Sequence, residues 1–219
     1  MLRKIFSTAL LATFLLVTAC GQKLPEFGAD KAVEAYAQLY TCGEIDDELK
    51  SATNLTDADI AEARSKVVAT LLHFMKRYPL SDETLQTVTK KYLDRLNNIK
   101  DITATLTKGD ETHPIVELVT TNINHESALI FAEEDDDLNA LANELATLKA
   151  QGVTDDELKR NPEFQKRALA AIGNFVDSFV MNAEATILVP CKIVTGSDGK
   201  LYWQPENVEA IEHYISGQN

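Results

Sequence analysis

Two stretches of this chain alternate apolar and polar residues with a period of two, and each stretch folds back at a turn signal. The first begins at Ile102, and a turn at residues 109–112 (GDET) leads into the apolar run 115–123. In the second, residues 185–195 and 200–204 flank a turn that contains Asp-Gly, a strong signal for a β-hairpin. The sequence therefore predicts two β-hairpins, which can join into one four-stranded antiparallel sheet.

The remaining parts of the chain after the N-terminal region show the spacing of amphipathic helices, in which apolar residues recur every three or four positions. Thr56 and Ser81 are expected N-caps, and a looser acidic stretch covers residues 44–54. The expected helices cover residues 30–41, 56–78 and 81–99. Helices resume from His125, with one from Leu138 to near Gly152, a stretch starting at Thr154 or at Asn161, and residues 205–215. The predicted fold class is α+β, with helices packed on one four-stranded antiparallel sheet built from two hairpins and a helical segment between the hairpins.

The first residues of the chain have the layout of a secretory signal. Residues 1–4 (MLRK) are basic, and the apolar run 5–17 has 13 residues, whereas a membrane-spanning helix takes about 20. We therefore expect a signal peptide over residues 1–19, a short tether over 20–28 and a single α+β domain over 29–217.

The end of this signal, Val17-Thr18-Ala19-Cys20, resembles the lipobox of bacterial lipoproteins. The resemblance implies that the Cys20 thiol carries diacylglycerol, that the chain is cut before Cys20, and that the new amino group is acylated, for example with palmitate. Two or three acyl chains give stable membrane anchoring where a single chain is marginal. The resemblance further implies an outer-membrane destination in a cell that has one, because Gly21 replaces the aspartate that commonly signals inner-membrane retention.

The charge balance bears on the partners of the chain. Its net charge is −13, and removal of residues 1–19 takes away Arg3 and Lys4, which leaves 19 basic and 34 acidic residues, or −15. This balance excludes nucleic acid as a partner, because phosphates need a basic patch. The expected partners are the membrane, through the lipid on Cys20, and either an envelope protein or a small ligand.

Two cysteines remain once Cys20 is assigned to the lipid, and each is predicted to point inward. Cys42 shares a helical stripe with Leu39, and Cys191 shares a strand face with Val189. In a compartment that permits disulfides, Cys42 and Cys191 could form a bridge over a very long loop, worth about 2–4 kcal/mol. Two separate buried thiols that behave as small hydrophobes are the alternative.

The sequence predicts neither a metal site nor a cofactor. The acidic run 133–137 begins like a calcium loop, but Ala140 and Ala146 stand where glycine and a bidentate glutamate are required. His125 begins a zinc motif whose second histidine is replaced by Leu129. A nucleophile elbow and a phosphate-binding glycine loop are also missing, so no catalytic residue is assigned.

The order of the elements, together with residues 199–203 (GKLYW), resembles the cystatin-like or NTF2-like group of extracytoplasmic lipoproteins. That resemblance implies a concave sheet with a pocket. We expect a membrane-anchored lipoprotein with a non-enzymatic binding or envelope-associated role, and the alternative is a ligand carrier or enzyme that uses a pocket in the curved sheet. A third hypothesis is oligomerisation through the stripe Leu138, Leu141, Leu145 and Leu148 if it is exposed.

Overall fold

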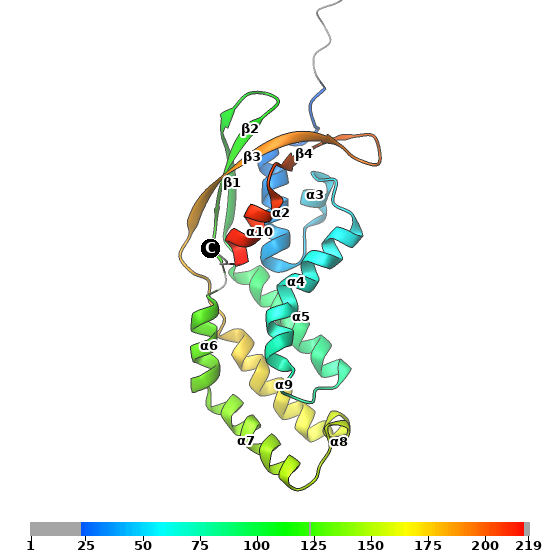
Figure 1. Ribbon diagram of the computed structural model, residues 1–219, viewed down its shortest axis with the longest axis vertical. Coiled ribbons are helices and arrows are strands. Elements are labelled where there is room, and N and C mark those ends of the chain that lie inside the picture. The colour runs from blue at the N-terminus through cyan, green and yellow to red at the C-terminus, as the bar shows by residue number, and fades with distance from the viewer. Residues whose placement is uncertain (1–22, 123, 217–219) are drawn as a thin grey trace, which may run out of the picture.

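The computed structural model describes residues 23–122 and 124–216, which form an elongated molecule with a sheet at one end and a helical bundle at the other (Figure 1). The elements follow the predicted order of helices, hairpin, helices, hairpin and short helix. They are α2 (Ala29–Cys42), α3 (Asp47–Ser51), α4 (Asp57–Met75), α5 (Asp82–Ile99), β1 (Ile102–Gly109), β2 (Pro114–Thr120), α6 (His125–Glu134), α7 (Asp136–Ala150), α8 (Asp155–Arg160), α9 (Pro162–Asp177), β3 (Ala185–Thr195), β4 (Leu201–Pro205) and α10 (Val208–Ser216).

The two hairpins form one antiparallel sheet with the strand order β1-β2-β3-β4, which confirms the predicted fold class. The central pairing joins the hairpins, with Val116 opposite Val189 and Leu118 opposite Ile187. Val116, Leu118 and Val189 are buried on one face, because side chains of a strand alternate between the two faces of a sheet.

The inner face of the sheet curves over α2 and α10 (Figure 1). These two helices are amphipathic and pack on each other; α2 also contacts β1, β2 and β4, and Ile211 and Ile215 of α10 join the same core. The resulting core includes Ala32, Val33, Tyr36, Val116, Leu118, Val189, Cys191, Trp203, Ile211 and Ile215.

A second hydrophobic core lies in the helical end of the molecule. Helices α4, α5, α7, α8 and α9 contribute Leu71, Met75, Tyr92, Leu96, Leu138, Leu141, Leu145, Leu158, Phe164, Ile172 and Phe175. The ring of Phe74 stacks on that of Phe175, with centroids 4.5 Å apart. Helix α5 contacts α9 in this core and also contacts α2, whose Cys42 belongs to the same core, so α2 and α5 connect the two ends.

The helix starts match the predicted caps closely, because these residues satisfy free backbone amides. Thr56 and Thr154 each form a capping box, and Ser81 accepts a hydrogen bond from the amide of Thr84. Thr154 and Asn161 both start helices, so the two alternatives in the sequence are both present, as α8 and α9.

Several details of the structure differ from the sequence-based expectation. Strand β2 ends at Thr120 rather than at residue 123. Pro205 closes the edge strand β4, where a proline is tolerated, so the last helix starts at Val208 rather than at residue 205. The acidic stretch 44–54 contains the short helix α3. Helix α4 ends at Met75 rather than at Tyr78, and the amide of Tyr78 instead bonds back to the carbonyl of Met75. A single turn stabilised by few hydrogen bonds leaves only a weak periodic signal, which explains why α3 was not anticipated.

Candidate functional site

The lipidation site predicted from the sequence, Cys20 with Gly21 after it, lies outside the described residues. Within the described part of the chain, no helix has the length and the apolar character needed to cross a bilayer.

Cys42 and Cys191 are both buried free thiols, and they lie in different hydrophobic cores. Burial raises the pKa of each thiol to about 12. A thiol with such a pKa is almost entirely protonated at neutral pH and therefore unreactive, since the thiolate is the nucleophile.

The acidic residues that could suggest a metal site form hydrogen bonds within the protein instead. Asp135 is the N-cap of α7, where its Oδ1 accepts a hydrogen bond from the amide of Leu138 at 2.8 Å. Asp137 accepts one from Asn174 at 3.0 Å. Among the described residues, no group of three or more potential ligands is arranged to hold a metal ion.

The inner face of the sheet is filled by side chains. Tyr36 from α2 and Ile211 from α10 are 3% and 1% exposed, and both belong to the sheet core. They occupy the place where a ligand pocket of the kind implied by the cystatin-like or NTF2-like resemblance would lie.

The leucine stripe on α7 is also covered. Leu138, Leu141 and Leu145 are at most 8% exposed, and they pack in the helical core rather than against the sheet. Leu148 is partly buried against the same core, so the stripe packs mainly within the chain.

A polar groove of about 380 Å³ lies beside the sheet core, between α2, the α3–α4 connection, α4, β4 and α10. We call it the tyrosine groove, and it is lined by Tyr36, Leu39, Tyr40, Asn54, Leu55, Asp59, Glu62, Ala63, Lys66, Gln204 and Val208. Tyr36 and Tyr40 are four residues apart on α2, so they lie on the same face of the helix. Its size falls within the range of natural small-molecule pockets.

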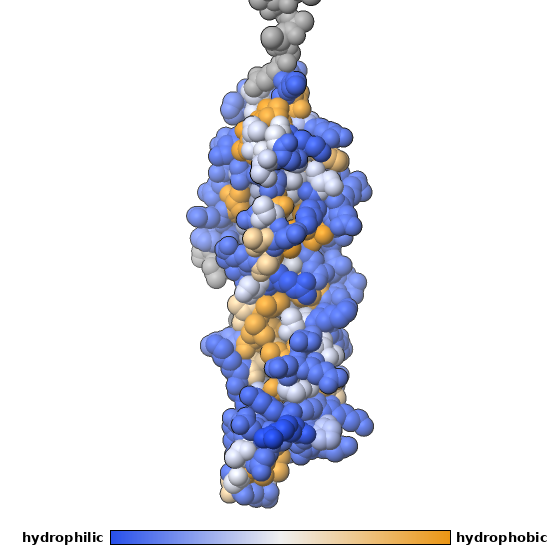
Figure 2. All heavy atoms as spheres, turned by 90° about the vertical axis from the view of Figure 1, so that its right-hand side faces the viewer, coloured by the Kyte–Doolittle hydropathy of each residue, from blue (hydrophilic) through white to orange (hydrophobic). Residues whose placement is uncertain are grey.

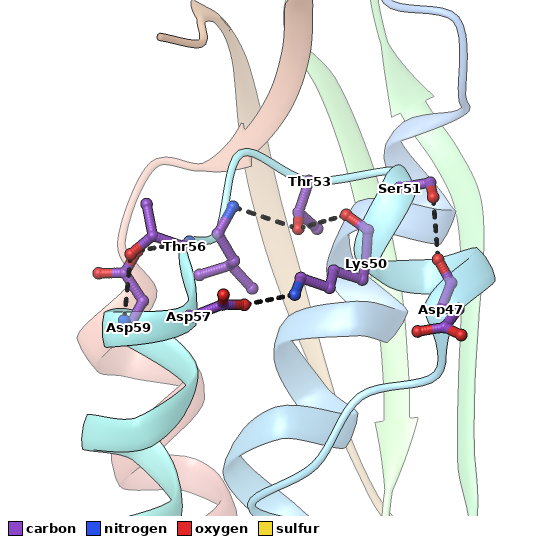
Figure 3. A network of polar contacts seen from close by, with 8 residues as sticks. Asp47, Lys50, Ser51, Thr53, Thr56, Asp57 and Asp59 are labelled. Atoms are coloured by element: carbon purple, nitrogen blue, oxygen red, sulfur yellow. Dashed lines mark hydrogen bonds and ion pairs between the residues drawn. The ribbon is translucent and has the colours of Figure 1, made fainter. Parts of the chain in front are cut away.

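A network of polar contacts fixes the rim of this groove (Figure 3). The Oγ1 of Thr53 donates a hydrogen bond to the carbonyl of Lys50 at 3.0 Å, and the Nζ of Lys50 lies 2.6 Å from the carboxylate of Asp57. In the capping box, the carboxylate of Asp59 accepts bonds from the amide and the hydroxyl of Thr56 at 2.8 and 2.6 Å. The connection that carries Asn54 and Leu55 is thus held between α3 and α4.

The charges of the groove are partly compensated. The Nζ of Lys66 lies 3.0 Å from Glu212 on α10 and 3.5 Å from Glu62, and the bond to Glu212 is the main cause of its raised pKa. The bonds from Thr56 lower the pKa of Asp59, so this carboxylate stays ionised. Burial raises the pKa of Tyr36 to about 12 against the opposing effect of its hydrogen bond with the Gln204 side chain, so the phenol stays neutral.

No protein-family model matches this sequence, and a search of curated proteins found no match. Among solved structures, the fold is similar to the crystal structure of a protein described as a lipoprotein (ycdA) from Bacillus subtilis subsp. subtilis str. 168. The TM-score is 0.50 at 14% sequence identity, and the superposition covers 86% of this chain and 55% of that chain. The likeness is one of fold. This chain spans about half the length of that protein.

The tyrosine groove was not predictable from the sequence. Its residues come from segments as distant as α2 and β4, and no local motif links Tyr36, Tyr40 and Gln204. The available signal was indirect: Tyr36 lies on an otherwise apolar helix stripe, where a buried hydroxyl usually requires a polar partner.

Proposed function

We propose that this chain is an extracytoplasmic lipoprotein, anchored to the membrane by lipid on Cys20, and that its α+β domain has a non-enzymatic binding role. The signal layout over residues 1–19 and the lipobox support the anchor. The similarity of fold to a protein described as a lipoprotein is consistent with it. In a cell with an outer membrane, Gly21 makes that membrane the proposed destination.

The observation that carries the binding role is the convergence of two phenols and two amides in the tyrosine groove. Tyr36, Tyr40, Asn54 and Gln204 can each donate and accept hydrogen bonds, while Leu55 and Val208 add apolar contact. Sites with a few convergent polar groups on a partly apolar wall recognise small molecules. The proposed ligand is therefore a small polar molecule bound through hydrogen bonds.

The anchor is tested by metabolic labelling with a clickable palmitate analogue, followed by membrane fractionation. The Cys20→Ser variant should lose the label and leave the membrane fraction, because both proposed acylation sites, the thiol and the new amino group, belong to Cys20. The Cys42→Ser variant is the matched control and should keep both the label and the membrane association. Unchanged fractionation of Cys20→Ser would refute the anchor.

The binding role is tested by titrating a panel of free amino acids and monosaccharides into the protein. Trp203, the single tryptophan, is 6% exposed and precedes Gln204, so its fluorescence should report on a ligand in the groove. A ligand that gives a saturable change should bind about tenfold more weakly to Tyr40→Phe, which loses a hydroxyl worth about 1.4 kcal/mol. Tyr202→Phe is the control and should bind normally, because Tyr202 does not line the groove and its hydroxyl donates to Asp198 in the β3–β4 turn. If no panel member binds, or if the two variants respond alike, the groove is not the site.

A further inference from the structure

The end of the molecule where the described chain begins holds a shallow hollow of about 570 Å³. We call it the tether hollow, and its main walls are Lys23, Leu24 and Phe27 from the tether and Lys200, Leu201 and Tyr202 from the β3–β4 hairpin. In Figure 1, the blue start of the described chain and the turn between β3 and β4 lie at the same end, opposite α7 and α8.

The tether hollow combines apolar, aromatic and basic side chains, and Figure 2 shows a hydrophobic area among hydrophilic residues at this end of the molecule. Leu24 is 47% exposed, and Phe27 and Tyr202 are half-buried. Lys23 and Lys200 are exposed, and neither ammonium group forms an ion pair within the described part of the chain. Aromatic rings with lysines beside them are typical of protein surfaces that contact the interfacial layer of a membrane.

Two acidic residues lie near these lysines. Asp198 is held within its own turn, since it accepts hydrogen bonds from the hydroxyl of Tyr202 at 2.8 Å and from the amide of Lys200 at 3.0 Å. Glu26 is the one acidic residue among those that line the hollow. The lining has two lysines and one glutamate, and Asp198 beside it balances the remaining positive charge, so this end is locally neutral although the whole chain has a net charge of −13.

The position of the lipid anchor limits how far this hollow can be from the membrane. Only three positions separate Cys20 from Lys23, and an extended chain spans at most about 3.6 Å per residue, or about 11 Å in total. This step rests on the proposed lipidation of Cys20. Given that anchor, the tether hollow is within reach of the lipid headgroups.

We propose that the tether hollow docks on the headgroup layer of the membrane, with Lys23 and Lys200 on lipid phosphates and Leu24 and Tyr202 at the interface. The acidic start of α8 (Asp155, Asp156 and Glu157) lies toward the opposite end (Figure 1) and is repelled by an anionic surface. The docked molecule projects its helical end away from the membrane.

The test measures lipid proximity in the full lipidated protein, reconstituted in phosphatidylcholine vesicles with or without phosphatidylglycerol. A fluorophore is attached at Ser51→Cys, which lines the hollow, or at Gln151→Cys, which is exposed at the far end. The native thiols Cys42 and Cys191 are buried and will not be labelled. Lipids with a spin label at the headgroup should quench the fluorophore at Ser51→Cys and not the one at Gln151→Cys, more strongly with phosphatidylglycerol present.

Charge reversal tests the role of the lysines. A lysine near an anionic membrane surface increases the equilibrium constant for membrane binding about fivefold. The double variant Lys23→Glu with Lys200→Glu should therefore lower the ratio of docked to undocked molecules by at least about 25-fold. Lys76→Glu with Lys159→Glu makes the same charge change at the far end and should leave quenching unchanged.

The two proposals fail in distinguishable ways. Palmitate labelling and membrane association without quenching at Ser51→Cys would overturn the docking and leave the anchor intact. Equal quenching at Ser51→Cys and Gln151→Cys, or equal loss in the two double variants, would also overturn the docking. Absence of palmitate on Cys20 would overturn the anchor and, with it, the docking that depends on it.

Discussion

Replacing Gln165 should destabilise the folded protein far more than replacing an exposed glutamine would. Gln165 lies on α9, and its side chain is buried in the helical end. Its Nε2 donates hydrogen bonds to the carbonyls of Pro79 and Leu158, both at 2.9 Å, and its Oε1 accepts one from the amide of Ser81 at 2.8 Å. One side chain thus satisfies three backbone groups from the α4–α5 connection and the end of α8.

The substitution Gln165→Leu keeps the approximate shape and removes all three hydrogen bonds. The carbonyl of Leu158 keeps a bond from the amide of Asn161, so two buried backbone groups, the carbonyl of Pro79 and the amide of Ser81, lose their partner at about 1–3 kcal/mol each. Burying the leucine methyl groups in place of the amide returns about 1–2 kcal/mol. The expected loss in the free energy of unfolding is about 3 kcal/mol, a large fraction of the stability of a typical domain.

The assay is equilibrium unfolding in urea, followed by far-ultraviolet circular dichroism and by the fluorescence of Trp203. The dichroism is dominated by the helices, whereas Trp203 belongs to the sheet core. If residues 29–217 form the single domain predicted from the sequence, both transitions should coincide and shift together in Gln165→Leu. Lys166→Leu, an exposed neighbour on the same helix, should stay within about 0.5 kcal/mol of the parent protein.

Two results would refute this reasoning. A loss below about 1 kcal/mol for Gln165→Leu would show that the three backbone groups do not depend on the amide. A shift of the dichroism transition without a shift of the Trp203 transition would show that the two cores unfold independently, which contradicts a single domain.

Three further predictions concern the caps, the thiols and the leucine stripe. Thr56→Ala and Thr154→Ala each remove a capping box and should each lower the free energy of unfolding in urea by about 1 kcal/mol. Only Thr56→Ala should weaken the binding of a ligand in the tyrosine groove, and equal effects of the two variants on ligand binding would contradict the role of the rim. Cys42 and Cys191 should react with a thiol reagent only in denaturant, and rapid labelling of the native protein would count against this. Because the folded pKa of about 12 exceeds the unfolded value of 9.0, the contribution of these thiols to the free energy of unfolding is complete below pH 9 and is lost as the pH rises toward 12. Leu138→Ala should lower the free energy of unfolding by about 3 kcal/mol, because it leaves a cavity in the helical core. Its elution volume in size-exclusion chromatography should stay unchanged, and a change of oligomeric state would indicate that the stripe is an interface.

The hairpins were predictable from the sequence because both signals are local. The alternation that begins at Ile102 and the Asp198-Gly199 turn each act within a few residues, and Gly199 has the positive φ of 79° that such a turn requires. The caps at Thr56, Ser81 and Thr154 were predictable for the same reason, since a cap bonds to amides two or three residues away.

The candidate site was not predictable, because its parts are far apart in the sequence. Tyr36 and Gln204 line one groove although 168 positions separate them, and only the packing of α2 beside β4 brings them together. The same holds for Gln165, whose partner Ser81 is 84 positions away and whose burial contradicts the usual surface position of glutamine.

The sequence by itself determined the element types, the hairpin turns and the N-terminal signal layout, because periodicity, caps and turn residues act over short distances. The tertiary structure decided how the apolar faces are divided between two cores. The leucine stripe starting at Leu138 is an example. Its spacing predicts an apolar face, but that face could equally pack on the sheet, on a second molecule or on other helices. It packs on the helices that include α9, since the inner face of the sheet is already filled by α2 and α10. A helix specifies which face it buries, and the competition among all such faces selects the partner.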